Sequence, residues 1–192
     1  MGPSLQSELA GLVRRCLAGD EGALRELVQR FYGPVFGLCY RMLGHRQDAE
    51  DAVQETFLRL VRNLHRWDPQ RDMLPWVLAI AGNRCRTMLA ARKMPLAAEE
   101  AVLTLPDRAA SQAPADELNE ELQQALARIR PQHREAFLLF HEHGLAYEQI
   151  AAALGVPLGT VKTWVHRARQ ELFACMRQRE GVTETSHALP RV

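Results

Sequence analysis

The stretch from Tyr147 to Leu172, YEQIAAALGVPLGTVKTWVHRARQEL, constrains the fold more strongly than any other part of the chain. Its first eight residues place Ile150 and Leu154 on one face of a short helix. Gly155 suits the positive φ that ends a helix, and Pro157 suits the first turn of the next helix, where a missing N–H costs nothing. The spacing therefore predicts two short helices joined by a tight turn.

The second helix of this stretch is predicted to be amphipathic. Its apolar positions recur at intervals that fit one helical face, namely Val161, Val165, Ala168 and Leu172. Its other face is basic and polar, with Lys162, Thr163, His166, Arg167, Arg169 and Gln170. A solvated surface helix is the plainer interpretation of such a face. The coincidence of the face with the tight turn favours a helix-turn-helix, whose second helix reads the major groove of DNA.

Composition extends the helical expectation to the whole chain. Ala, Leu, Arg, Glu and Gln dominate, and runs of alternating β-branched residues are missing from the sequence. We expect an all-α protein of two small helical domains joined by a flexible linker. The C-terminal domain is expected to be a helix-turn-helix, winged-helix-like without a wing. The net charge of +1 means that any DNA binding depends on local basic patches, so the free protein should bind DNA weakly.

Neither a metal, a cofactor nor a membrane is expected as a partner. Cys16, Cys39, Cys85 and Cys175 are scattered, without the spacing of a zinc site or a disulfide framework. The close spacing of residues 141–143, His-Glu-His, fits a capped or solvated helix end better than a metal site. The chain shows neither an apolar run long enough to span a membrane nor a signal-peptide core, so we expect a cytoplasmic location.

Residues 1–93 predict the first helical domain. A helix near residues 8–19 is followed by one that Asp20 caps, in which Gly33-Pro34 predicts a kink or short break. Asp48 is predicted to cap the next helix, 48–64, whose wide core stripe includes Val61. The polar residues of this helix that point away from the stripe are Asp51, Gln54, Glu55 and Arg59.

The chain between Trp67 and Trp76 is a polar, proline-containing loop, and a helix is predicted from Trp76 to about Lys93. This helix carries four cations and no acid, so a solvated helix end and a patch that contacts nucleic acid both remain open. Residues 94–116, with three prolines, predict the linker, and residues 117–178 predict the second domain. Periodicity is lost after about Gln178, which predicts a disordered tail over 179–192.

Three segments together resemble an extracytoplasmic-function sigma factor of the sigma-70 family, namely DAEDAVQETFLRL, WDPQRDMLPWVLAIAGNRCRTML and IRPQHREAFLLFHEHGLAYEQIAAALGVPLGTVKTWVHRARQEL. The resemblance implies an alternative sigma factor, not an enzyme, that binds core RNA polymerase and directs promoter-specific initiation. It implies that residues 1–93 form sigma region 2, which binds polymerase and the −10 element. It also implies that residues 117–178 form sigma region 4, which binds the −35 element. The other implied partner is an anti-sigma factor, and the free chain is expected to be a monomer.

The resemblance assigns roles to three sets of residues. Polymerase binding is implied for Asp51, Gln54 and Glu55. Binding of the −10 element is implied for Trp67, Asp72, Leu74, Trp76, Asn83 and Arg86. Binding of the −35 element is implied for Thr160, Lys162, Thr163, His166, Arg167 and Arg169. Trp164 stands where the family usually has Arg, and it either packs at the core margin or wedges against the DNA backbone.

Two other classes of protein compete with this interpretation. A stand-alone helix-turn-helix regulator with a helical sensing domain would explain residues 147–172. The acidic helix from Asp48 and the two-tryptophan loop argue against it, since a sensing domain needs neither. A helical adaptor without a DNA role would instead leave Arg167 dispensable.

Overall fold

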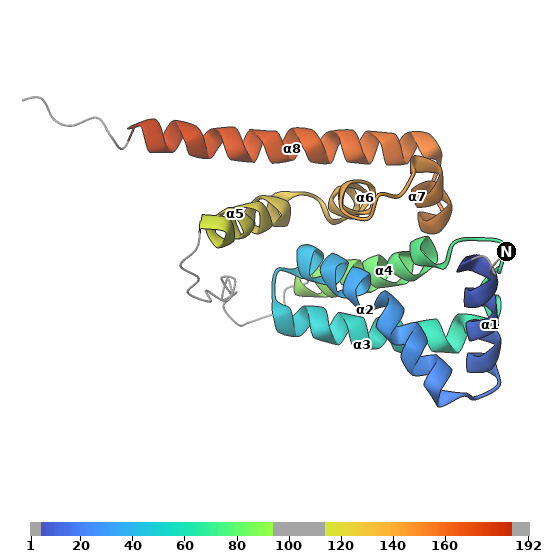
Figure 1. Ribbon diagram of the computed structural model, residues 1–192. Helices are drawn as coiled ribbons and strands as arrows, with labels where there is room; N and C mark the ends of the chain where they lie inside the picture. The colour runs from blue at the N-terminus through green and yellow to red at the C-terminus, as the bar shows by residue number, and fades with distance from the viewer. Residues whose placement is uncertain (1–4, 94–113, 186–192) are drawn as a thin grey trace, which may run out of the picture.

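The computed structural model describes residues 5–93 and 114–185, and these residues form helices and contain no strand. The all-α expectation is therefore confirmed for this part of the chain. The elements in chain order are α1 (Leu5–Leu17), α2 (Glu21–Leu43), α3 (Arg46–Asn63), the 3-10 turn η1 (Leu64–Arg66), α4 (Met73–Lys93), α5 (Pro114–Arg128), α6 (Pro131–His141), α7 (Tyr147–Leu154) and α8 (Leu158–Thr185). We call α1–α4 the N-terminal bundle and α5–α8 the C-terminal bundle (Figure 1).

α2 is the centre of the N-terminal bundle and packs against α1, α3 and α4. Its start is fixed as predicted, because the Asp20 carboxylate accepts a hydrogen bond of 3.0 Å from the Ala23 N–H. The helix continues through Pro34, so the predicted possibility of a break there is wrong. The buried face of α2 includes Leu27 and Leu38, which holds the bundle together by apolar burial.

Three details of the N-terminal bundle differ from the sequence prediction. α3 begins at Arg46 after a His45 that makes no capping bond, so Asp48 lies in the first turn instead of capping the helix. Asp48 forms an ion pair with Arg92 of α4. Val61 is 41% exposed and does not belong to the core. α4 begins at Met73, three residues before Trp76, so part of the expected loop is already helical.

The C-terminal bundle is organised around α8, which packs against α5, α6 and α7. The bounds of α7 are those predicted, and Gly155 ends it with a φ of 66°. α8 continues to Thr185, which is past Gln178, where the sequence predicts the second domain to end. The disorder of the tail stays a prediction. Residues 94–113 of the predicted linker and 186–192 of the predicted tail lie outside the described residues, and α5 already begins at Pro114.

The two bundles pack against each other. α2 contacts α5 and α6, and α4 contacts α6 and α7. Figure 1 shows α8 as the outermost helix, with α5–α7 between it and the N-terminal bundle, while α3 lies on the far side of that bundle. Within residues 5–93 and 114–185, none of the helices combines the length and apolar character that a bilayer crossing requires.

Candidate nucleic-acid and partner interfaces

The basic face of α8 is exposed as its spacing predicts. Val161, Val165 and Ala168 are buried against the rest of the C-terminal bundle, which turns the opposite side of the helix to solvent. The exposed side chains are those of Lys162, Thr163, His166 and Arg167. The Thr163 hydroxyl donates to the main-chain carbonyl of Gly159 at 2.8 Å, which fixes its rotamer on the helix surface. This face has the charge and the hydrogen-bonding groups that a major-groove reader needs.

Thr160 and Arg169, which flank this face, differ in their exposure to solvent. Thr160 is half-buried, whereas Arg169 is exposed. Arg169 lies over α6, with its Nη2 3.1 Å from Nε2 of His141. Burial, and then the nearby charge of Arg169, hold the pKa of His141 below its ordinary value. A neutral His141 can therefore accept from the guanidinium and orient Arg169 along the edge of the face.

Trp164 is half-buried and packs against the core of the C-terminal bundle. Its ring centroid lies 6.3 Å from that of His133 on α6. His133 in turn contacts the carboxylate of Glu171 through Nδ1 at 3.1 Å. Of the two alternatives for this position, the structure supports packing at the core margin.

The loop before α4 lines a cavity of about 490 Å³. Trp67, Asp72 and Trp76 meet there, so three of the six residues implied for the −10 element share one cavity. Trp67 is only 8% exposed and gives the cavity a rigid wall. The wall on the other side comes from the C-terminal bundle, through Glu148, Gln149, Ala152 and Ala153 of α7.

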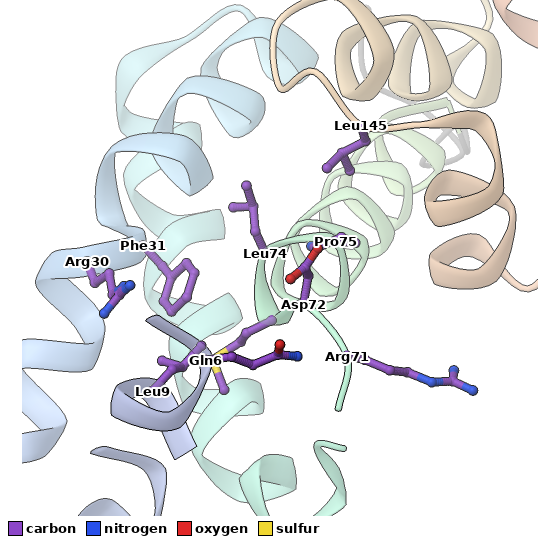
Figure 2. Close-up of a pocket in the computed structure, with 10 residues that line it drawn as sticks. Gln6, Leu9, Arg30, Phe31, Arg71, Asp72, Leu74, Pro75 and Leu145 are labelled. Carbon is purple, nitrogen blue, oxygen red and sulfur yellow. The ribbon is translucent and has the colours of Figure 1, made fainter. Parts of the chain in front are cut away.

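Leu74 does not share this cavity. It lines a second cavity, also of about 490 Å³, together with Leu9 of α1, Phe31 of α2 and Leu145 (Figure 2). The lining of this second space is mostly apolar near Leu74, which fits packing between the bundles better than contact with a base. Leu74 therefore lines a different cavity from the two tryptophans, although Asp72 and Pro75 line both.

Asn83 and Arg86 lie one turn apart on α4, and the Arg86 Nη2 is 3.4 Å from the Asn83 Oδ1. Asn83 is exposed. The Arg86 guanidinium forms an ion pair with Glu135 of α6, and the Glu135 side chain is completely buried. Burial lowers the pKa of Arg86 from its ordinary value. The cation implied for DNA contact is therefore already engaged by the C-terminal bundle.

The polar residues implied for polymerase binding lie on one exposed side of α3. Asp51 and Gln54 are exposed, and Glu55 is held by Arg59 at 2.8 Å. The hydrogen bond from Arg59 keeps the pKa of Glu55 below its ordinary value, so this carboxylate is charged.

Two exposed apolar residues extend this surface and were missed in the sequence. Leu58 is 53% exposed and Val61 is 41% exposed. Their positions, seven and ten residues after Asp51, continue the same helical face, and that spacing is the signal that could have revealed them. We call Asp51, Gln54, Glu55, Leu58 and Val61 the α3 surface. It places two apolar groups beside polar ones, and an apolar centre with a polar rim is typical of protein-docking surfaces.

Comparison with protein families places two sigma-factor regions on the chain. Sigma-70 region 2 matches residues 27–94, and sigma-70 region 4 matches residues 119–172. These ranges contain the α3 surface and both sets of implied DNA-binding residues.

Individual proteins agree with this result. The chain is 37% identical over 164 residues to the ECF RNA polymerase sigma factor SigE of Mycolicibacterium smegmatis, covering 80% of this chain and 63% of that protein. It is 33% identical over 159 residues to the RNA polymerase sigma factor CarQ of Myxococcus xanthus, covering 80% of this chain and 89% of that protein. The solved structure of CnrH in complex with the cytosolic domain of CnrY has the same fold, with a TM-score of 0.64, 24% identity and coverage of 87% of this chain and 96% of that one. The chain therefore belongs to the sigma-70 family of RNA polymerase sigma factors, in its extracytoplasmic-function group.

Proposed function

We propose that this chain acts as an alternative sigma factor, which binds core RNA polymerase and directs it to promoters through two separate DNA-reading surfaces. The observation that carries the proposal is the presence, on one chain, of an exposed basic face on α8 and a two-tryptophan cavity at the start of α4. The proposed role of the chain is to bind and position DNA, which requires no catalytic residues. The N-terminal bundle is proposed to function as sigma region 2, and the C-terminal bundle is proposed to function as sigma region 4.

The α8 face is proposed to read the −35 element as duplex DNA. Thr163 and His166 are exposed on this face, and their side chains are proposed to hydrogen-bond to base edges in the major groove. Lys162 and Arg167 supply the positive charge that draws the helix to the phosphates, and Arg167 can also bond a guanine. Thr160 and Arg169 flank the face and are proposed to contact the backbone.

The N-terminal bundle is proposed to capture unpaired bases of the −10 element. The cavity between Trp67 and Trp76 offers aromatic walls on which a flipped base can stack. Extrusion of a base costs a few kcal/mol, which the pocket contacts offset. Asn83 and Arg86 follow on the next turns of α4, where an amide can read a base edge and a guanidinium can hold a phosphate.

The α3 surface is proposed to dock on core RNA polymerase. Its carboxylates can form charge-assisted hydrogen bonds with arginines of the partner, and Leu58 and Val61 supply an apolar centre. An anti-sigma factor is proposed as a further partner. Structures of related fold were solved with such partners, among them the sigma factor RpoE of Bartonella quintana with the anti-sigma factor NepR.

Reconstitution with core polymerase tests this function. The chain should form a stoichiometric complex with core enzyme on gel filtration and should allow specific transcripts from a pool of bacterial genomic fragments. A stand-alone regulator would bind duplex fragments without holding core polymerase. Recovery of sequence-specific duplex binding, together with no complex and no transcript, would replace the proposal by that alternative.

A further inference from the structure

We propose that His141 of α6 and Arg169 of α8 form one phosphate-binding pair at the edge of the −35-reading face, and that His141 takes up a proton when a DNA phosphate binds there. This inference rests on the proposed function of the α8 face. It adds to that face a residue from outside the recognition helix, and it makes the affinity for the −35 element rise as the pH falls.

The pair is formed by a direct contact between the two helices. Nη2 of Arg169 lies 3.1 Å from Nε2 of His141. Both residues are exposed, so a phosphate can approach both of them from solvent. Arg169 follows His166 by three residues and Lys162 by seven, so these three side chains line one side of α8. The pair therefore continues the row of basic groups on the reading face toward α6.

The pair lacks a counter-ion among the residues that the structure describes. Burial and the positive charge of Arg169 are the causes that shift the pKa of His141, and neither comes from an acid. Arg46, an exposed arginine of α3, differs in this respect because it pairs with Glu50 at 2.9 Å. Two basic groups in contact without a carboxylate attract an anion, and the anion that lines the major groove is the DNA phosphate.

Two phenylalanines of α6 fix the orientation of the His141 ring. The ring centroid lies 4.5 Å from that of Phe137 and 4.9 Å from that of Phe140, whose ring meets it at 88°. Phe140 in turn stacks on Tyr147 of α7, with 4.5 Å between the ring centroids. A ring held from two sides keeps Nε2 directed at Arg169, so little side-chain entropy is lost when a phosphate binds.

Protonation changes the hydrogen bonds that this ring can make. In the free protein the neutral ring accepts from the Arg169 guanidinium through Nε2. Both nitrogens of the protonated ring donate, so the Nε2–H and a guanidinium N–H can donate to the same phosphate group. The negative charge of the phosphate favours the protonated ring and raises the pKa of His141, which burial and Arg169 lower in the free protein. The proton comes from solvent.

The direction of the pH effect follows from this difference in pKa. The complex holds the proton of His141 more tightly than the free protein does. Binding therefore strengthens as the pH falls through the pKa of the complex, and the gain levels off below the lowered pKa of the free protein.

The neighbouring titratable groups on other elements make separate contacts. Glu142 forms an ion pair of 3.1 Å with Arg41 of α2. Tyr147 of α7 is engaged in its aromatic stack, and His143 is half-buried. Arg169 is thus the charged group that α8 directs at His141.

The first test measures the affinity of holoenzyme, assembled from core RNA polymerase and each variant, for a fluorescent duplex that carries the upstream element of a promoter selected by the transcription assay. With the unmodified protein the affinity should rise about threefold to tenfold from about pH 8 to about pH 6, since one unit of pKa shift corresponds to a factor of ten. His141→Gln should lose this rise, whereas His143→Gln, the matched control, should keep it. His166 is present in all these proteins, so a pH effect from it is common to them.

Two further measurements separate a phosphate contact from a purely structural role of His141. His141→Lys, which carries a fixed cation, should bind tightly at both pH values. At about pH 6, the plot of log affinity against log salt should be steeper by about 0.9 for the unmodified protein than for His141→Gln, because one more phosphate is neutralised. At about pH 8 the two slopes should agree.

Equal pH profiles for the unmodified protein and His141→Gln would overturn the inference. An affinity that falls on acidification in the unmodified protein, but not in His141→Gln, would also overturn it, because the neutral ring would then only orient Arg169. Absence of sequence-specific binding to the upstream element at both pH values would instead refute the proposed function of the α8 face.

Discussion

Arg134 of α6 is 4% exposed and donates through Nη1 to the main-chain carbonyl of Met42, in the last turn of α2. Its Nη2 donates to the carbonyls of Ala127 at 2.8 Å and Ile129 at 3.1 Å, at the end of α5. Burial lowers the pKa of Arg134 to about 10, so it remains a cation at neutral pH. The negative ends of two helix dipoles meet this single charge, which joins the two bundles.

Replacing Arg134 by Met should lower the free energy of unfolding by roughly 2–4 kcal/mol, because three main-chain carbonyls lose their donor and two of these hydrogen bonds are buried. Urea denaturation followed by circular dichroism measures the change. Arg130→Met, at an exposed position four residues earlier, should change stability by less than about 0.5 kcal/mol. Equal stability of the two variants would show that Arg134 does not hold the bundles together.

Replacing Trp164 by Arg should cost about 1–3 kcal/mol of stability through loss of the packed ring beside His133. Because position 164 faces α6, the salt dependence of binding to the duplex −35 element should not change. Trp164→Phe should keep most of the stability. A salt slope steeper by about one unit in the Arg variant would instead place this position against a DNA phosphate.

The turn between α7 and α8 could be predicted from sequence because its signals are local. The bounds of α7 follow from residues that contact one another within a few positions, and the φ of 66° at Gly155 confirms the predicted helix end. The exposed face of α8 follows equally from the burial of its apolar stripe.

Features that depend on distant partners could not be predicted in this way. Glu135 sits in a polar sequence, PQHREAF, and its burial becomes understandable only with Arg86, which is 49 residues away in the chain. Val61 fitted the apolar period of its helix, but the neighbours available to α3 leave it exposed. Asp48 is a good capping residue and predicts the start of α3, whereas the helix begins at Arg46 without a side-chain cap.

Changing Leu58 to Asp should weaken binding to core RNA polymerase by about tenfold or more, because an apolar contact at the centre of the α3 surface is lost. Competition with a fluorescent sigma factor for core enzyme measures this affinity. Leu17→Asp is the matched control, since Leu17 and Leu58 are both 53% exposed and lie on different helices. If both substitutions weaken polymerase binding equally, the α3 surface is not the docking site.

Acidification should destabilise the protein partly through His143. Burial lowers the pKa of His143 in the folded state, so below about pH 6.5 the unfolded chain binds this proton first. The contribution is absent above that pH and grows as the pH falls toward the folded pKa. Burial raises the pKa of the neighbouring Glu142, which acts in the opposite direction at lower pH.

A comparison of variants isolates the histidine. Between pH 7 and pH 5.5, His143→Gln should lose less stability than the unmodified protein, as measured by the urea midpoint at each pH. His65→Gln, at an exposed position, should follow the unmodified protein. Parallel curves for all three proteins would contradict the assignment to His143.

The most direct test of the account is transcription by core RNA polymerase and this protein from a promoter library randomised in both elements. The unmodified protein should enrich promoters with two separate conserved elements. Substitution of Thr163 or His166 should change the preferred bases of the upstream element alone, and Trp76→Ala should weaken selection in the downstream element alone. Equal loss of activity on every promoter, or the absence of any enriched element, would contradict the claim that this chain reads promoters through two surfaces.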